Sequence, residues 1–288
     1  MNRKHHVLTR GLARSPAALP HTGMPDDNAP VQAGTGQLDV RWAASEEDVR
    51  EAQHLRYQVF AQEMGARLNP PDGTARGLDV DRFDAFCDHL LVRAVLPGDD
   101  GDGPLVGTYR VLGPQAAQRA GGLYSDSEFD LAPLASLRPQ AVELGRSCVH
   151  PAWRSGGVIM ALWSALCQYM LVHRLDTMIG CASIGLDDGG RMAGRLWRHL
   201  RHTHLAAPQW QVNPLMPLPL DDAVDLPPAI PGVKGMADAP PLIKGYLRCG
   251  ARLLGPPALD AAFNTADLPM MLRIDELAPR YRKHFLGS

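Results

Sequence analysis

The sequence predicts one α/β domain with a mixed sheet, and three observations support that prediction. Segments with the composition of β-strands alternate with helical segments along most of the chain. The 288 residues are 45% hydrophobic and 21% charged, which is typical of a globular protein that buries a sizeable core. The sequence contains no internal repeat and no second candidate core, so a single domain over residues 38–288 is the economical interpretation.

The predicted domain follows an N-terminal segment of different composition. Residues 1–37 are rich in Pro, Gly, Ala and Asn and show little apolar periodicity, so we expect a flexible tail there. Ser45 and the three acidic residues after it are a helix-start signal, and apolar residues then recur at helical spacing as far as Phe60. A polar loop rich in Asp, Gly and Pro continues to about residue 88.

The remaining elements alternate between strands and helices. The patterns predict, in chain order, strands at 89–96 and 105–112 that form a hairpin, a central strand at 141–149, a buried helix at 158–173, a strand at 177–184, a helix at 190–204, a proline-rich ordered excursion at 206–241, a helix whose apolar residues run from Leu242 to Leu254, and a closing strand at 268–274. This alternation is typical of α/β proteins.

Composition and charge argue against several classes of protein. The five cysteines are scattered and never form a CxxC pair, which argues against a disulfide framework or a zinc site. A net charge of -2 gives no global reason to expect nucleic-acid binding. The sequence has neither a secretory signal nor a run of eighteen apolar residues, so we expect a cytoplasmic protein without a membrane span.

The segment VHPAWRSGGVI is a candidate anion site. Arg154 and Ser155 precede the adjacent Gly156 and Gly157, which lie immediately before the predicted buried helix. Without Cβ atoms, such a backbone can bring several N–H groups against a phosphate at a helix N-terminus. On spacing alone, a tight connection between a strand and a helix is the more common explanation of two adjacent glycines.

This segment resembles the pyrophosphate loop of the GNAT acyltransferase superfamily, R-x-x-G-x-G/A, with Arg154 and Gly157 matching and Ile159 where a small residue is usual. Further ordered blocks, among them RYQVFAQEMGARL, LDVDRFDAFCDHLLV, VGTYRVL, ELGRSCVHPAWRSG and DAAFNTAD, resemble the bacterial L-ornithine N-α-acyltransferases. That family is similar to the acyl-homoserine lactone synthases, and the resemblance runs from about residue 40 to the C-terminus.

The resemblance implies a GNAT-like fold with a mixed, mostly antiparallel central sheet flanked by helices. It also implies transfer of a 3-hydroxyacyl chain from acyl carrier protein to the α-amine of L-ornithine, which gives lyso-ornithine lipid. The donor would be a co-substrate, with no permanently bound cofactor and no metal. Its phosphopantetheine arm would contact Val149, Arg154, Ser155, Gly156, Gly157 and Val158.

Glu143 is the candidate general base. An amine attacks a thioester only when it is neutral, and burial in an apolar strand would raise the pKa of Glu143 so that it can accept a proton near neutral pH. The alternative is a carboxylate that pairs with an arginine inside the fold. Arg146, also assigned to the catalytic site, would face the other side of a regular strand. The resemblance implies a β-bulge between Gly145 and Val149 that brings both residues to one site and separates the strand from its neighbour.

The acidic segment DVDRFDAFCD lacks the spacing of an EF-hand loop, which argues against a metal site. The resemblance implies contacts with ornithine for six residues from three blocks: Arg56, Phe60, Asp79, Asp81, Asp84 and Arg110. In that arrangement the aspartates fold against the arginines and meet the cationic side chain of ornithine; the alternative is a structural salt-bridge cluster that closes the site. Arg146 would hold either the substrate carboxylate or this acidic loop.

Other features have weaker chemical implications. Cys148 lies two residues before His150, a spacing open to a Cys–His nucleophile, but a free cysteine in a core strand is usually a packing residue. Two predicted helices carry basic ridges, which consist of Arg191, Arg195, Arg198 and His202 on one helix and Lys244, Arg248 and Arg252 on the other. Such ridges are usually solvated faces, and either one would suit carrier protein or the anionic headgroups of a membrane surface.

Three rival functions stand beside the acyl transfer to ornithine. The first is an acyl-homoserine lactone synthase, against which the C-terminal extension through IKGYLRCGA argues. The second is a GNAT enzyme that uses acetyl-CoA or another acyl-CoA, which Ile159 disfavours. The third is a module without catalytic activity that binds acylated carrier protein at the membrane.

Overall fold

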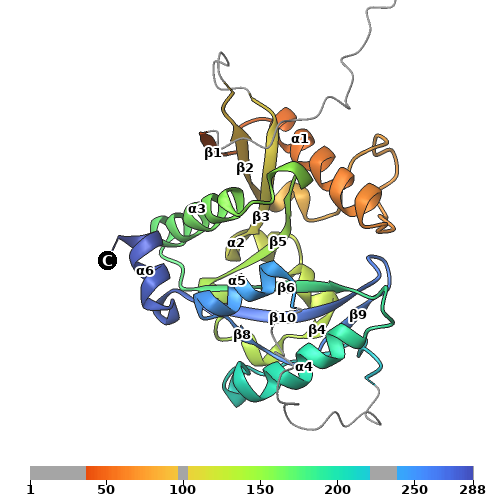
Figure 1. Cartoon of the computed structure of the whole chain (residues 1–288), viewed down its shortest axis with the longest axis vertical. Coiled ribbons are helices and arrows are strands. Elements are labelled where there is room, and N and C mark those ends of the chain that lie inside the picture. The colour runs from red at the N-terminus through yellow and green to blue at the C-terminus, as the bar shows by residue number, and fades with distance from the viewer. Residues whose placement is uncertain (1–36, 97–102, 221–238, 288) are drawn as a thin grey trace, which may run out of the picture. The chain divides into compact units, whose positions relative to one another are not determined.

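A mixed sheet of eight strands organises the structure, a computed structural model that describes residues 37–96, 103–220 and 239–287. The strand order is β1-β2-β3-β5-β6-β10-β8, and β9 pairs with the beginning of β10 (Figure 1). The strands are β1 (Leu38–Trp42), β2 (Asp88–Ala94), β3 (Leu105–Leu112), β5 (Ala141–Val149), β6 (Thr177–Gly185), β8 (Arg252–Leu253), β9 (Ala258–Asp260) and β10 (Thr265–Arg273). Only β5 and β6 run parallel among these pairs, which confirms the predicted mostly antiparallel sheet. A separate short pair joins β4 (Phe129–Asp130) to β7 (Asn213–Pro214).

The helices are α1 (Glu46–Tyr57), α2 (Pro114–Arg119), α3 (Gly157–His173), α4 (Arg191–Thr203), α5 (Pro241–Cys249) and α6 (Pro279–Leu286). None of the helices formed by the described residues is long and apolar enough to cross a membrane. The predicted N-terminal tail falls outside the described residues apart from Gln37, and so do residues 97–102 of the hairpin and residues 221–238 of the predicted excursion.

Helix α1 begins at the predicted cap. The Ser45 hydroxyl accepts a hydrogen bond from the Asp48 backbone N–H at 3.1 Å, and the Asp48 carboxylate accepts one from the Ser45 N–H at 3.2 Å. After Tyr57 the chain continues as a π-helical turn over Gln58–Glu63, so Phe60 lies on this turn rather than in the α-helix. Such turns occur frequently at functional sites.

Helices α1 and α3 lie on opposite faces of the half of the sheet formed by β1, β2 and β3 (Figure 1). A Cβ atom on Gly107 of β3 would lie 2.4 Å from Val158 Cγ1, so the first turn of α3 rests directly on the sheet there. Cys148 of β5, on the opposite face, packs with Leu55 of α1. Gly107 pairs with Val149, the residue after Cys148 in β5, and consecutive residues of a strand face opposite sides of the sheet. The two contacts therefore place α1 and α3 on different faces.

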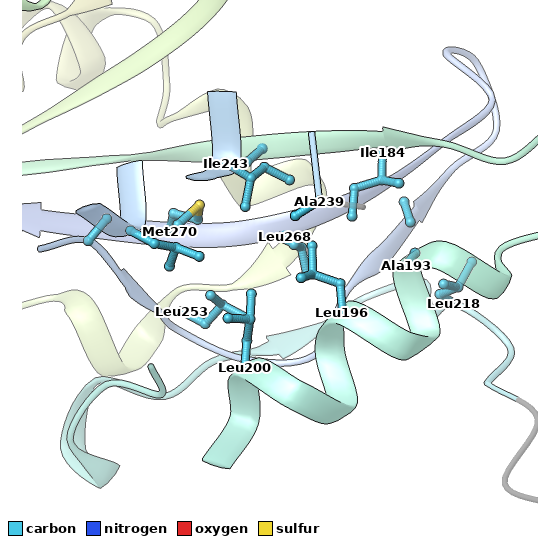
Figure 2. Close-up of a cluster of buried hydrophobic side chains, with 14 residues drawn as sticks. Ile184, Ala193, Leu196, Leu200, Leu218, Ala239, Ile243, Leu253, Leu268 and Met270 are labelled. Carbon is cyan, nitrogen blue, oxygen red and sulfur yellow. The ribbon is translucent and has the colours of Figure 1, made fainter. Parts of the chain in front are cut away.

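The other half of the sheet, β6, β10 and β8, is covered by α4 and α5. Leu196 and Leu200 of α4 point toward Leu253 and Leu268 of the sheet, and Ile243 of α5 joins the same cluster (Figure 2). None of these side chains is more than 2% exposed. Burying a leucine or isoleucine contributes about 1.5–3 kcal/mol, so this cluster fixes β6 and β10 firmly relative to α4.

Several elements differ from the sequence prediction. Strand β1 and helices α2 and α6 were not predicted. Helix α5 stops at Cys249, so Leu254 lies beyond it. The reason is Gly250, which has φ +111 and sits where a Cβ atom would be 2.6 Å from the Glu276 carbonyl oxygen, a geometry that ends the helix.

Candidate active site

Strands β5 and β6 separate after three residue pairs. Their register covers Ala141–Thr177, Val142–Met178 and Glu143–Ile179, and neither strand pairs with the other beyond that point. Both strands continue, so Leu144–Val149 and Gly180–Gly185 enclose a gap that we call the wedge. At its narrow end a Cβ atom on Gly180 would lie 2.4 Å from the Leu144 carbonyl oxygen. The separation confirms the predicted opening beside β5. It leaves backbone N–H and C=O groups of both strands available to a ligand.

A β-bulge lies in β5 where it was predicted. Thr108 pairs with Cys148 and Arg110 pairs with Gly145, so Tyr109 faces two residues, Arg146 and Ser147. Arg146 has φ +52, in the left-handed region that non-glycine residues seldom adopt. The bulge brings Glu143 and Arg146 to one side of the strand, as their shared neighbour Tyr124 shows: Glu143 accepts its N–H, and the Arg146 guanidinium lies 5.1 Å from its ring centroid.

A cavity of about 500 Å³, the main cavity, extends along the wedge. Glu143, Arg146, Arg110 and Phe60 lie on its wall, together with residues from the beginning of α3, from α5 and from the β9–β10 hairpin. This volume falls in the range of small-molecule sites, and the lining combines apolar surface with a few charged groups. The main cavity is therefore the candidate active site.

Glu143 is 5% exposed and is held by backbone groups. Its Oε2 accepts the Tyr124 N–H at 2.6 Å and its Oε1 accepts the Ser125 N–H at 2.7 Å. Burial raises the pKa of Glu143 above its ordinary value, and these hydrogen bonds offset only part of that effect. The structure thus differs from the alternative of a direct arginine ion pair. The pKa of Glu143 is thus shifted in the direction that favours proton uptake by a buried carboxylate.

The predicted arginine–aspartate network is present and lies behind the wall of the main cavity. Arg56 is fully buried and contacts Asp79 Oδ2 and Asp84 Oδ2, each at 2.8 Å. Arg110 contacts Asp81 at 2.7 Å and Asp84 at 3.2 Å. Burial raises the pKa of Asp84, but Arg56 and Arg110 outweigh it and hold that pKa at about 2. Of these five residues, only Arg110 lines the cavity.

Arg146 joins this network to the cavity. Its Nε lies 3.2 Å from Asp79 Oδ2 and its Nη2 lies 3.3 Å from Asp81 Oδ2. The guanidinium also lies 4.6 Å from the centroid of the Phe263 ring. Three aspartates therefore balance three arginines. The network supports the position of Arg146, and among the described residues no group of three or more His, Cys, Asp and Glu side chains is arranged to hold a metal ion.

Three carboxylates that sequence reasoning missed form what we call the acidic recess: Glu128, Asp260 and Asp267. Asp260 and Asp267 line the main cavity. Burial and the neighbouring negative charges raise the pKa of Asp267 to about 6 and that of Glu128 to about 7, while Arg146 acts in the opposite direction on both. Arg146 forms its ion pairs with Asp79 and Asp81 rather than with the recess. The sequence signal that could have indicated this recess is Asp267, an aspartate inside the otherwise apolar strand segment TADLPMML.

The N-terminus of α3 lies at the wall of the main cavity. Gly156 caps the helix with φ +106, and Gly157 is its first residue. The first backbone N–H groups of a helix have no partner inside it and favour an anion. Val149, Arg154 and Gly156 line the cavity, whereas Val158 is buried against Gly107 and the predicted contact Ser155 is exposed.

Arg154 is already paired at the cavity wall. Its two Nη atoms contact the Glu63 carboxylate at 2.5 Å and 2.7 Å, and its Nε donates to the Val149 carbonyl oxygen at 3.0 Å. The hydrogen bond from Arg154 lowers the pKa of Glu63. A phosphate at the α3 N-terminus therefore has to compete with Glu63 for the guanidinium.

Cys148 is a packing residue. It is 5% exposed in a cluster with Leu55 and Val59, and burial raises its pKa to about 12. The Nδ1 atom of His150 accepts a hydrogen bond from the Ala152 N–H at 3.3 Å. A thiol in such an environment stays protonated and is a poor nucleophile.

The sheet that opens beside β5, with a helix N-terminus on the wall of the opening and a buried glutamate at its narrow end, defines an acyltransferase of the GNAT class. Residues 55–164 match the family model described as an acetyltransferase (GNAT) domain. An L-ornithine N(alpha)-acyltransferase of Agrobacterium fabrum is 38% identical over 274 residues, which are 93% of this chain and 92% of that protein. A protein of the same name from Brucella abortus is 38% identical over 87% of this chain and 89% of its own length. The chain belongs to the L-ornithine N(alpha)-acyltransferase family.

A solved structure supports the fold independently. The crystal structure of the AHL synthase LasI matches 88% of this chain and 96% of its own, with a TM-score of 0.50 and 13% sequence identity. At that identity the similarity concerns the fold alone.

Proposed function

We propose that this N-acyltransferase transfers a 3-hydroxyacyl chain from acyl carrier protein to the α-amine of L-ornithine, giving lyso-ornithine lipid. The observation that carries the proposal is that the wedge opens into a cavity with more carboxylates than arginines. Three aspartates already pair with Arg56, Arg110 and Arg146, while the carboxylates of the acidic recess are buried beside one another. An amino acid with two ammonium groups complements this charge, in agreement with the names of the relatives.

The acceptor amino acid lies between opposite charges in this proposal. Arg146, fixed by Asp79 and Asp81 and placed beside the rings of Tyr124 and Phe263, receives the carboxylate of ornithine. The acidic recess receives the side-chain ammonium. The α-amine is then directed toward the narrow end of the wedge, where Glu143 lies.

Glu143 acts as the general base, directly or through one water molecule. It accepts a proton from the α-ammonium, and the neutral nitrogen attacks the thioester carbonyl carbon. The C–S bond then breaks and the amide forms as the nitrogen gives up a second proton. One of the two protons passes through Glu143 to the departing pantetheine thiolate, and the other is released to water. The raised pKa of Glu143 supports this role, because the carboxyl has to carry the proton between two steps.

The donor enters along the wedge as a co-substrate. Its phosphodiester lies at the N-terminus of α3, against the backbone of Gly156, Gly157 and Val158 and beside Ser155, with Val149 below it. Arg154 turns from Glu63 to the phosphate. The thioester carbonyl accepts a hydrogen bond from an amide of β5 next to the bulge, which stabilises the oxyanion.

The carrier protein docks beside the cavity on the basic ridge of α5. Pro241 and Leu242 at the beginning of α5 line the main cavity, and Arg248 on its last turn is exposed. Arg252, predicted on the same helical ridge, is also exposed but lies beyond the end of α5, on β8, because the helix stops at Cys249. The ridge on α4, which includes exposed Arg191 and Arg195, belongs to a helix that contributes no residue to the cavity. An acidic partner is steered by such positive charge.

One incubation separates the proposed function from its rivals. Purified enzyme is mixed with 3-hydroxyacyl carrier protein, and free carrier thiol is measured with and without ornithine. Release that requires ornithine supports the proposal. Turnover that requires S-adenosylmethionine, turnover with acetyl-CoA and a small amine, or binding without turnover would each identify one of the rivals instead.

A further inference from the structure

A second, apolar cavity adjoins the main cavity on the α3 and α5 side of the sheet. Its volume is about 70 Å³, and apolar residues of α3, β6, β10 and the C-terminal segment surround it, among them Leu166, Met178, Met270, Leu277 and Phe285. Six residues line both cavities: Tyr109, Leu144, Trp163, Cys181, Ala182 and Tyr246. We call these six residues the junction.

The junction carries polar groups that an apolar passage does not need. The hydroxyl oxygens of Tyr109 and Tyr246 are 2.5 Å apart, and the Ser147 side chain lies near Tyr109. A phenol has one proton and can accept further hydrogen bonds, so a pair of phenols uses only one of its two protons internally. The group of hydroxyls can therefore donate to, and accept from, a further oxygen.

Trp163 adds a donor without a partner. Its side chain is 9% exposed, and its Nε1 is buried and makes no hydrogen bond within the described part of the chain. Buried polar atoms are rarely left in this state. Its ring lies 5.3 Å from that of Tyr246, and a Cβ atom on Gly245 would lie 2.3 Å from Trp163 Cη2, so α5 fixes the indole in place.

The junction lies close to the proposed position of the thioester, so the part of the donor that contacts it is the beginning of the acyl chain. Ser147 belongs to the bulge, and Leu144 lies where β5 and β6 separate. Because the junction lines both cavities, an acyl chain that runs from a thioester at the bulge into the apolar cavity passes it, and the first carbons of that chain lie there. A polar group accepted at this point belongs to a carbon close to the thioester.

The geometry points to the junction as the binding subsite for the 3-hydroxyl group of the acyl donor, with Tyr109, Tyr246 and Trp163 as the residues that recognise it. The inference rests on the proposed function and adds the chemical feature by which the enzyme selects its donor. The hydroxyl donates to one phenol oxygen and accepts from the spare phenol proton or from the indole N–H. Burial raises the pKa of both tyrosines, so both remain protonated donors.

The test compares two donors of equal chain length, 3-hydroxypalmitoyl and palmitoyl carrier protein, by the kcat/KM of thiol release with ornithine. Wild-type enzyme is expected to prefer the hydroxylated donor. Tyr246→Phe removes one hydroxyl and should lower the ratio of the two kcat/KM values about 3- to 10-fold, the effect of one neutral hydrogen bond. Trp163→Phe, which removes the indole N–H, should lower the same ratio and serves as a second variant if the first folds poorly.

Tyr169→Phe is the matched control. Tyr169 is on α3 outside both cavities and donates to Asp88 Oδ2 at 2.8 Å, so the ratio should keep its wild-type value. Equal wild-type activity with both donors, or variants that slow both donors equally, would overturn the assignment of the junction while leaving ornithine acylation intact. Wild-type enzyme that transfers neither chain to ornithine would overturn the proposed function, and the junction assignment with it.

Discussion

Replacement of Asp267 by asparagine should stabilise the folded protein while weakening ornithine binding. Asp267 is 3% exposed, and burial beside Asp260 raises its pKa from the ordinary 3.8 to about 6. Between these two values the folded state binds more protons than the unfolded state, so this carboxyl lowers stability as the pH rises through 4 to 6. At about 1.4 kcal/mol per pH unit, the loss is about 1.5 kcal/mol at pH 5 and about 3 kcal/mol at pH 8.

Asparagine has nearly the same shape and can still accept the hydrogen bond that Thr265 donates to Asp267 at 2.9 Å. Urea unfolding at pH 5 and pH 8 should therefore show a gain in the free energy of unfolding for Asp267→Asn that grows with pH. The same change at exposed Asp72 should have no effect at either pH. A variant no more stable than wild type at pH 8, or a gain that is equal at both pH values, would show that burial of Asp267 in the acidic recess does not raise its pKa.

Three further predictions concern the chemistry and the donor. Glu143→Gln should lower kcat about 100- to 10,000-fold, and the rise of wild-type kcat with pH through the raised pKa of Glu143 should disappear in a stopped-flow pH profile; a variant with the wild-type rate would exclude it as the base. Glu63→Gln should lower the KM for the carrier-protein donor because it frees Arg154, and an increased KM would show that the ion pair holds the arginine in its working position. Charge reversal at Arg248 should raise the donor KM at low salt more than reversal at Arg195, and the opposite order would place the docking surface on α4.

Much of the fold follows from periodicity and capping signals. The strand predicted at 141–149 has the bounds of β5, and the helix predicted at 158–173 differs from α3 by one residue. These elements were predictable because a long apolar run and a capping residue indicate an element from residues that are adjacent in the sequence. Strand β1 was missed because it has only five residues at the edge of the sheet, and its place depends on pairing with β2, about fifty residues further along the chain.

The candidate site was predictable only where a residue's neighbours are close in sequence or where the family resemblance supplied them. The bulge at Arg146 and Ser147 and the pairing of Arg56 with Asp79 and Asp84 followed from the resemblance. The acidic recess did not, since Asp267 reaches the cavity only because β10 lies beside β6 in the sheet. Local periodicity does not indicate which strands pair when they are far apart in the sequence.

In the proposed reaction the wedge delivers a thioester to the α-amine of an amino acid whose other ammonium group is held by the acidic recess. Tandem mass spectrometry of the product formed from 3-hydroxyacyl carrier protein and ornithine locates the new amide directly. We predict a fragment pattern with the acyl chain on the α-nitrogen and a free δ-amine. Acylation of the δ-nitrogen, or an equal mixture of the two amides, would contradict the account.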